Sequence, residues 1–350
     1  MNINSTFPHA RFLPGACRGM CVLLTAVLVF GATGVWAAAT VTLGTLAPEG
    51  TSYQRSLLEM REKWAKAPGG GVRLRIYAGG KLGGDAKMVS QMRLGALDAA
   101  MLTVAGLSAI EPAVTGLQGV PMMYRSLTEL DHVTEKLKVA LEERVEKQGF
   151  VVLFWSDAGW VHFFSKTPVR TPDDVKKVKL FTWAGEPKLV DIWKSGGYQP
   201  VPLETADIVP MLDSGLISCV PMPPFVALGA QVYDRAPNML RLNWAPLTGA
   251  LVIRKQVWDK IPAESKTVLR AAAEEAGRSN KAQGRSESEK AIAAMKEKGL
   301  KVQDVDDALE AQWRTEAEKF YPNIRGSYVP ADIFDRVQAL LKEYRAAAKP

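Results

Sequence analysis

Residue types that commonly do chemistry are scarce in this chain and do not combine into a reactive site. His9, His132 and His162 have no cysteine or second histidine at the spacing of metal ligands. The Gly-x-Ser-x-Gly turn that presents the serine of many hydrolases does not occur. We therefore expect no catalytic residue, no metal and no cofactor, and the protein is not expected to be an enzyme.

A glycine-rich segment at 79–84 looks at first sight like a phosphate-binding loop. In its sequence, Gly-Gly-Lys-Leu-Gly-Gly, the lysine comes too early and no serine or threonine follows it. A nucleotide-binding loop needs Gly-x-x-x-x-Gly-Lys-Ser/Thr, because its backbone amides, lysine and hydroxyl group must reach the phosphates and their metal together. We therefore expect no nucleotide at this segment.

The first 37 residues have the composition of a secretory signal peptide. Arg11 and Arg18 precede an uncharged apolar run at 19–36, which ends in small residues at Ala37 and Ala39. We expect cleavage after Ala37, which would deliver the protein across the inner membrane into the periplasm. A retained membrane anchor is the alternative, because an apolar run of about 20 residues is long enough to cross a bilayer.

Removal of the signal leaves a chain that is long enough for two lobes. Subtracting 37 from 350 leaves 313 residues, and Cys219 is the one cysteine among them, so no internal disulfide is expected. Subtracting Arg11 and Arg18 changes the net charge from +7 to +5, and the remaining charges are mixed in sign along the chain. We therefore expect a monomer that binds no nucleic acid.

Apolar residues alternate, or recur at helical spacing, along most of the remaining chain, which predicts an α/β fold with a parallel sheet. A new unit is expected to begin near Gly159, and the long helices near the end of the chain are expected to bind two lobes together. Strand patterns occur at 41–46, 72–77, 99–102, 150–155, 178–181, 199–203 and 248–254. Helix patterns occur at 53–67, 85–95, 127–147, 187–195, 263–299, 306–321 and 330–348.

Several short motifs occur in an order that resembles one family. The segment 74–85 reads Leu-Arg-Ile-Tyr-Ala-Gly-Gly-Lys-Leu-Gly-Gly-Asp, and Gly-Ala-Leu-Asp follows at 95–98. Together these segments resemble the solute-binding subunits of TRAP (tripartite ATP-independent periplasmic) transporters, of the dicarboxylate-receptor type. Further matching segments are 120–124, 172–176, 178–180, 200–203 and 257–262.

The resemblance implies a fold like that of periplasmic binding proteins, in which two α/β lobes surround a ligand cleft. Crossing strands and a long helix would join the lobes. On this basis we assign lobe I to 38–158 and 247–285, and lobe II to 159–246 and 286–340. The lobes would close on one small organic ligand and offer it to the membrane permease subunits of the transporter.

The chain departs from the family pattern at positions where ligands are usually bound. Val161 stands where members have the arginine of a Gly-Phe-Arg segment, and Phe181 stands where they have the arginine that ends Leu-Lys-Ile-Arg. The segment 218–223 replaces Asp-Gly-Gln-Glu-Asn-Pro, and Trp244 replaces a histidine or other polar residue. Arginine suits a carboxylate because its planar guanidinium donates two parallel hydrogen bonds. The usual ligand class is therefore in doubt.

These replacements predict a pocket lined by apolar and aromatic side chains, which would bind a hydrophobic or uncharged organic molecule. Ordinary core packing is the competing interpretation of the same residues. Aromatic faces also attract cations, so a quaternary amine could fit if Glu186 or Asp157 supplied an acidic partner. The expected ligand-binding residues are Trp160, Val161, Phe181, Trp183, Val220, Met222, Phe225 and Trp244.

Two other functions remain open at this point. The protein could bind an organic acid through other cations, such as Lys179 or Lys188. It could also be an interaction protein that hands a ligand to a partner and has no permease of its own. Genes for a small and a large permease subunit beside this one would distinguish these possibilities.

Overall fold

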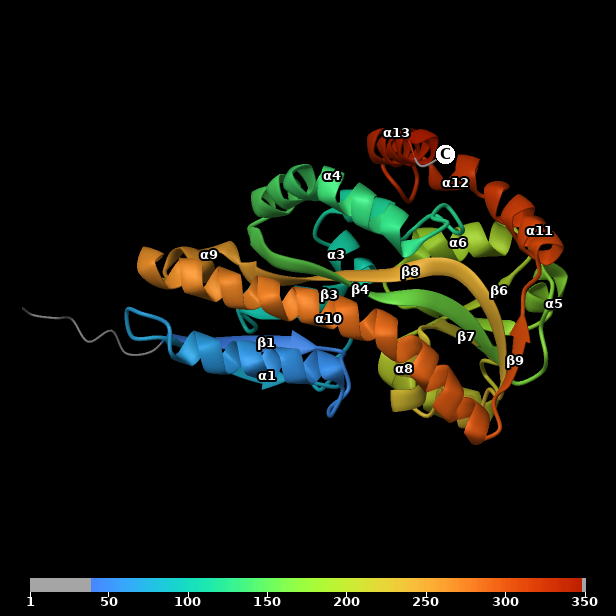
Figure 1. Ribbon diagram of the computed structural model, residues 1–350, viewed down its shortest axis with the longest axis horizontal. Coiled ribbons are helices and arrows are strands. Elements are labelled where there is room, and N and C mark those ends of the chain that lie inside the picture. The colour runs from blue at the N-terminus through green and yellow to red at the C-terminus, as the bar shows by residue number, and fades with distance from the viewer. Residues whose placement is uncertain (1–38, 348–350) are drawn as a thin grey trace, which may run out of the picture. The chain divides into compact units, whose positions relative to one another are not determined.

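One mixed sheet extends through the part of the chain that the computed structural model describes, residues 39–347 (Figure 1). Its strand order is β2-β1-β3-β8-β4-β7-β5-β6, and β9 pairs with β8 beside this series. The strands are β1 (Ala39–Thr45), β2 (Val72–Tyr77), β3 (Ala99–Thr103), β4 (Phe150–Ser165), β5 (Lys179–Trp183), β6 (Gln199–Leu203), β7 (Cys219–Met222), β8 (Asn238–Arg254) and β9 (Lys301–Asp304).

Helices follow most of these strands. The α-helices are α1 (Ser52–Ala65), α2 (Asp85–Leu94), α3 (Val104–Ser108), α4 (Leu127–Lys147), α5 (Pro172–Lys176), α6 (Pro187–Ser195), α7 (Ile208–Ser214), α8 (Pro224–Gly229), α9 (Lys255–Asp259), α10 (Ala263–Glu297), α11 (Asp307–Glu318), α12 (Tyr321–Ile324) and α13 (Ala331–Ala347). The 3₁₀ helices are η1 (Pro112–Leu117), η2 (Thr205–Asp207) and η3 (Val232–Asp234).

Two parallel groups of strands lie on either side of the antiparallel pair β4 and β8. In one group β1 pairs with β2 and β3, and in the other β5 pairs with β6 and β7. The helices α1 and α6 connect successive parallel strands, as parallel pairing requires. Local capping favours α1, because the Thr51 side chain accepts a hydrogen bond from the Gln54 amide. Leu57 and Trp64, seven residues apart, are buried on one face of that helix.

The long strands β4 and β8 join the two groups. Near its end β8 pairs with β3 through 249–253, whereas near its own end β4 pairs with β7 through 162–165. The pair is irregular between Asp157 and Trp160, where Gly159 has φ 76°, a conformation that glycine adopts without strain. Gly249 lies so near the Leu102 carbonyl that a Cβ there would clash, so β8 and β3 approach closely.

Helix α10 crosses the sheet beside both groups of strands (Figure 1). Its first half packs on α1 and the first group, where Leu269 and Ala273 are buried. Its second half packs on α8, where Ile292 and Met295 are buried. Gly284 on α10 is in contact with Tyr53 of α1, and a Cβ there would clash with the Tyr53 hydroxyl. Small residues thus let α10 lie close to its neighbours.

The predicted α/β fold is confirmed, but the sheet is mixed, because the long strands β4 and β8 pair antiparallel where a parallel sheet was predicted. Several short elements, such as β7, β9 and α3, were not predicted, and some predicted elements have other bounds. The strand predicted at 150–155 continues to Ser165, because the irregularity at Gly159 bends β4 without ending it. The strand predicted at 248–254 begins already at Asn238. The helix predicted at 306–321 ends at Glu318, and α12 begins with Tyr321-Pro322; proline lacks the amide that would continue the helix.

The predicted lobe boundaries fall inside β4, β8 and α10, which run through them without a linker. The predicted signal peptide, residues 1–37, lies outside the described residues. Within residues 39–347 no helix is long and apolar enough to cross a membrane.

Candidate ligand-binding site

A cavity of about 140 Å³ lies at the middle of β4 and β8, between the two groups of strands. The ends of β1 and β3 line one side of it, together with Tyr53 at the start of α1. Strand β5, the end of β7 and the start of α8 line the other side. The carboxyl ends of parallel strands are where α/β folds commonly bind ligands. The fold therefore brings both parallel groups to one central cavity.

Aromatic side chains form two walls of this central cavity. Phe181 and Trp183 stand two residues apart on β5, and their rings meet edge to face with centroids 5.2 Å apart. Tyr53 stacks on Phe225 of α8, with centroids 5.3 Å apart and planes inclined by 17°. Met222, at the end of β7, adds a thioether to the lining. These contacts fix the shape of an apolar chamber.

Charged groups are almost absent from the central cavity. Among the described residues that line it there is no lysine, arginine or histidine, and Asp157 is the one ionisable acid. The other polar lining groups are hydroxyls such as those of Thr45 and Thr248. Thr45 already accepts a hydrogen bond from the Ala47 amide. A carboxylate placed in this cavity would therefore have no cation to bind.

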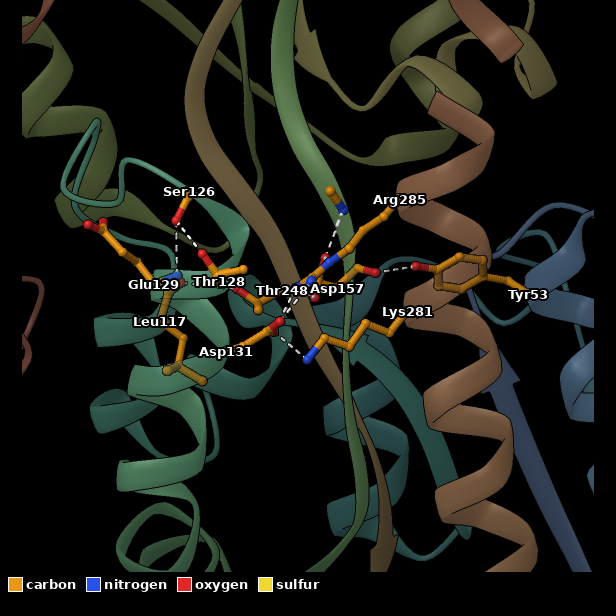
Figure 2. A network of polar contacts seen from close by, with 11 residues as sticks. Tyr53, Leu117, Ser126, Thr128, Glu129, Asp131, Asp157, Thr248, Lys281 and Arg285 are labelled. Carbon is orange, nitrogen blue, oxygen red and sulfur yellow. Dashed lines mark hydrogen bonds and ion pairs between the residues drawn. The ribbon is translucent and has the colours of Figure 1, made fainter. Parts of the chain in front are cut away.

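Asp157 is the buried member of a partly exposed ion-pair network (Figure 2). Arg285 of α10 donates to Asp157 from Nε at 2.9 Å and from Nη2 at 2.7 Å. The same guanidinium donates to both carboxylate oxygens of Asp131 on α4, at 2.8 and 2.7 Å, and Lys281 also pairs with Asp131. The Tyr53 hydroxyl donates to the Asp157 carbonyl at 2.6 Å. This network joins α1, α4, β4 and α10.

Ionisation in the network follows from these contacts. Burial opposes the charge of Asp131, but the hydrogen bonds from Arg285 and Lys281 outweigh it, and the pKa of Asp131 lies below its usual value. Burial likewise opposes the charge of Arg285, yet Asp131 and Asp157 raise the pKa of that guanidinium. Asp131 and Arg285 therefore stabilise each other as ions, which is the arrangement expected of a structural ion pair.

A second cavity of about 70 Å³ lies next to the central one, and Phe181, Trp183 and Pro221 line both. Trp193 and Trp244 form its aromatic wall, with ring centroids 5.5 Å apart and planes inclined by 28°. Its one ionisable acid, Glu186, accepts a hydrogen bond from the Tyr328 hydroxyl at 2.5 Å, and Val161 completes the lining. Burial raises the pKa of Glu186, although the Tyr328 hydroxyl partly opposes this.

The structure brings six of the eight predicted site residues to these two cavities. Phe181, Trp183, Met222 and Phe225 line the central cavity, whereas Val161, Trp244, Phe181 and Trp183 line the second. Trp244 also packs in the core against Phe163 and Trp313.

The other two predicted residues lie elsewhere. Trp160 borders a polar pocket on another side of β4, together with Arg285 and His162. Val220 is fully buried in the core around β7, where it opposes Phe164 of β4. Both stand one residue away from a cavity-lining neighbour, and successive side chains of a strand point to opposite faces.

Other lining residues were not predicted. Tyr53 follows β1 closely, and the rule that strand ends meet at one edge of a sheet could have indicated it. Tyr328 comes from the turn before α13, far along the chain from Glu186, and no sequence signal pointed to it. The lysines considered as alternative cations lie elsewhere: Lys179 is exposed, and Lys188 donates from Nζ to the Ser327 carbonyl.

The histidines and the cysteine have structural surroundings. His162 is buried and its Nδ1 lies 2.8 Å from the Leu242 carbonyl, which fixes the ring; burial lowers its pKa to about 4. Cys219 is buried, and burial raises the pKa of its thiol. Within residues 39–347 no group of three or more histidine, cysteine and acidic side chains could hold a metal ion.

Comparison with known proteins gives a consistent result. The family model described as bacterial extracellular solute-binding protein, family 7 (DctP) matches residues 43–326. The 2,3-diketo-L-gulonate-binding periplasmic protein of Escherichia coli is 28% identical over 238 residues, 67% of this chain and 71% of that protein. The C4-dicarboxylate-binding periplasmic protein of Rhodobacter capsulatus is 23% identical over 242 residues, 69% of this chain and 72% of that protein.

Solved structures share the fold. A TRAP periplasmic solute-binding protein from Sulfurospirillum deleyianum with bound succinate has a TM-score of 0.80 at 21% identity, covering 87% of this chain and 100% of that one. One from Haemophilus influenzae with bound L-gulonate has a TM-score of 0.78 at 17% identity, covering 88% and 99%. The family model spans far more than half of the chain, and the resemblance seen in its motifs is confirmed. The chain belongs to family 7 of the bacterial extracellular solute-binding proteins, the DctP family that includes the solute-binding proteins of TRAP transporters.

Proposed function

We propose that this protein is the periplasmic receptor of a TRAP-type secondary uptake transporter, and that its ligand is a predominantly hydrophobic or uncharged organic molecule. Membership of the family supports the first part. The second part rests on one observation: the central cavity is lined by Phe181 where the family pattern has arginine, and no described lysine, arginine or histidine lines it.

The energetics of burial favour this ligand class over a carboxylate. The relatives and solved structures named above carry acids in their names, namely diketogulonate, C4-dicarboxylate, succinate and gulonate. An acid buried beside Phe181 would lose its hydration without gaining a cation, which costs several kcal/mol. An apolar molecule would instead gain roughly 25 cal/mol for each Å² of apolar surface that it buries.

The mechanism that we propose is closure of two lobes about β4, β8 and α10. Lobe I would comprise 38–158 and 247–285, and lobe II 159–246 and 286–340. A ligand in the central cavity contacts residues assigned to both lobes, such as Thr103 and Phe181, so its apolar contacts favour the closed state. The receptor would reach the periplasm after removal of residues 1–37, act as a monomer without catalysis, and pass its ligand to membrane permease subunits.

An organic acid is the second candidate, because the named relatives bind acids. It would need a cation that reaches the cavity, and Lys179 and Lys188 do not line it. A ligand-handing protein without its own permease is the remaining alternative, which the presence of neighbouring permease genes would oppose.

Native mass spectrometry tests the ligand class directly. The full chain is exported to a bacterial periplasm, purified, and extracted with organic solvent to identify what it carries. An apolar species, such as a fatty acid, terpenoid or aromatic compound, supports the proposal. A bound dicarboxylate or sugar acid overturns it and leaves the family membership intact.

The variant Phe181→Arg adds a second test. It places a guanidinium in the central cavity, so an apolar ligand should bind at least about tenfold more weakly, as expected when a charge must be desolvated. Phe181→Leu is the matched control, since it keeps the wall apolar, and thermal unfolding checks that both variants fold. A protein that really binds an acid would tolerate the arginine or gain affinity from it.

A further inference from the structure

Glu186 differs from the other buried acids in what surrounds it. It stands immediately before α6, is 6% exposed, and makes no side-chain hydrogen bond to the first turn of that helix. Its recorded partner is the Tyr328 hydroxyl. Within residues 39–347 no lysine, arginine or histidine pairs with it, and none lines the second cavity. A buried carboxylate normally has a cation or several donors, so this one, with a single neutral donor, lacks a cationic partner.

The surroundings of Glu186 suit a positively charged group. Trp183, Trp193 and Trp244 line the same small cavity, and the negative faces of indole rings attract cations. Thr182 also lines it, and the Thr182 hydroxyl is buried without a hydrogen-bond partner among the described residues. The cavity therefore offers a carboxylate, aromatic rings and a free hydroxyl to one small polar group.

Two other acids, Asp85 and Glu204, lie in the neighbourhood of Glu186. Asp85 at the start of α2 is buried, and burial raises its pKa to about 7, with Glu186 and Glu204 adding to the rise against the hydrogen bonds from Thr103. Glu204 lies directly against Gly84, where a Cβ would clash with its carboxylate. Acidic side chains thus gather near Glu186, and none of the contacts among the described residues supplies a cation to it.

We infer that the second cavity is a subsite for a basic nitrogen, so that the ligand has an apolar body in the central cavity and an amine that binds Glu186. The shared walls Phe181 and Trp183 make the two cavities neighbours, and the inferred ligand would extend past these walls from one cavity into the other. The ammonium group donates hydrogen bonds to the Glu186 carboxylate and lies against the indole rings. At about 70 Å³ the second cavity has room for an amine but not for a further ring. This inference rests on the proposed function.

Three compounds that share a phenyl body and differ at one end form the test: 2-phenylethylamine, 2-phenylethanol and phenylacetate. Their affinities are measured by isothermal titration calorimetry with the full exported chain, freed of carried ligand. The amine should bind at least about tenfold more tightly than the alcohol, because it forms a charge-assisted hydrogen bond in a dry site.

Variants then locate the effect. Glu186→Gln keeps the size of the side chain and removes its charge, so it should abolish the preference for the amine and leave the alcohol unchanged. Glu142→Gln is the matched control: Glu142 is half-buried, accepts a hydrogen bond from Trp155 Nε1, and lines neither cavity. That control should bind all three compounds as the natural protein does.

The outcomes separate this inference from the function on which it rests. An amine that binds no more tightly than the alcohol, or a preference that survives Glu186→Gln, overturns the subsite and leaves an apolar receptor in place. Phenylacetate binding most tightly overturns the proposed function itself.

Discussion

Asp157 and Glu186 are both buried carboxylates that line a cavity, but they differ in their partners. Asp157 is 4% exposed and Glu186 is 6% exposed. Asp157 receives two hydrogen bonds from Arg285 and a third from the Gly159 amide (Figure 2). Glu186 receives one from a neutral tyrosine. The fold therefore pairs Asp157 with a guanidinium and leaves Glu186 without a cation.

This difference in partners indicates that Asp157 carries a structural charge, whereas Glu186 is a candidate for binding a ligand. Breaking the pair of Asp157 would leave an uncompensated buried charge, so the pair must persist for the fold to hold. A buried carboxylate without a cation is expected to lower stability, so we expect Glu186 to cost stability in the ligand-free protein, as groups at binding sites often do. The predictions below test whether the two carboxylates really differ in this way.

The largest effect is expected from Arg285→Ala. It leaves Asp157 and Asp131 without their shared guanidinium, which should lower the free energy of unfolding by about 3–5 kcal/mol. Urea unfolding followed by fluorescence measures it. Lys281→Ala is the control, since Lys281 contacts Asp131 from the partly exposed rim and should cost less than about 1 kcal/mol. If both variants lowered the free energy of unfolding equally, Arg285 would have no special structural role.

Asp85 provides a pH-dependent test on the acidic side. Its pKa rises from 3.8 to about 7 on folding, so the folded protein holds a proton that the unfolded chain releases, and stability should fall as the pH rises from about 4 to about 7. The loss would be at most on the order of 4 kcal/mol, at about 1.4 kcal/mol per pKa unit. Asp85→Asn retains an acceptor for Thr103 and should abolish this contribution.

The measurement is thermal unfolding of both proteins across that pH range. The advantage of Asp85→Asn over the natural protein should grow toward pH 7. A constant difference between the two unfolding temperatures would show that Asp85 ionises normally in the fold.

The most direct comparison pairs Asp157→Asn with Glu186→Gln, and effects of opposite sign are expected. Asp157→Asn loses charged hydrogen bonds from Arg285, which should lower the free energy of unfolding by about 1.5–3 kcal/mol. Glu186→Gln removes a buried charge and should stabilise the ligand-free protein by about 1 kcal/mol. Urea midpoints at neutral pH measure both. A destabilised Glu186→Gln variant would mean that this carboxylate is as structural as Asp157.

Most of the fold could be predicted because the signals that define it are local. Apolar spacing located α4, α6, β2 and β6 at their observed bounds. The passage of β4 through Gly159 could not be predicted, since glycine after an apolar run ordinarily marks an end, and here the pairing with β8 holds the strand on both sides of the irregularity. Pairing between strands that lie far apart in the chain gives no local sequence signal near Gly159.

The candidate site could be predicted in part. Phe181 and Met222 were found because they occupy motif positions on β5 and β7, where backbone geometry fixes what faces the cavity. Trp160 and Val220 stand one residue from such positions and lie elsewhere. Tyr53 and Tyr328 reach the cavities only through tertiary packing. The sequence also could not show which of the two acids has a cation. Arg285, which pairs with Asp157, lies more than a hundred residues further along the chain.

The irregularity at Gly159 has a mechanical consequence, because it lies directly beyond the lining residues 156–158. The β4–β8 ladder is interrupted at three places, and the one at Gly159 is the interruption that adjoins these lining residues, so bending there would act directly on the ligand contacts. Helix α10 runs past Gly159 near its own middle, and half of its 35 residues span about 26 Å. A rotation of about 10° at Gly159 would move the end of α10 by roughly 4–5 Å over that span. If the proposed closure pivots here, a displacement of this size would convert occupancy of a small cavity into a change of surface shape that the proposed permease could recognise.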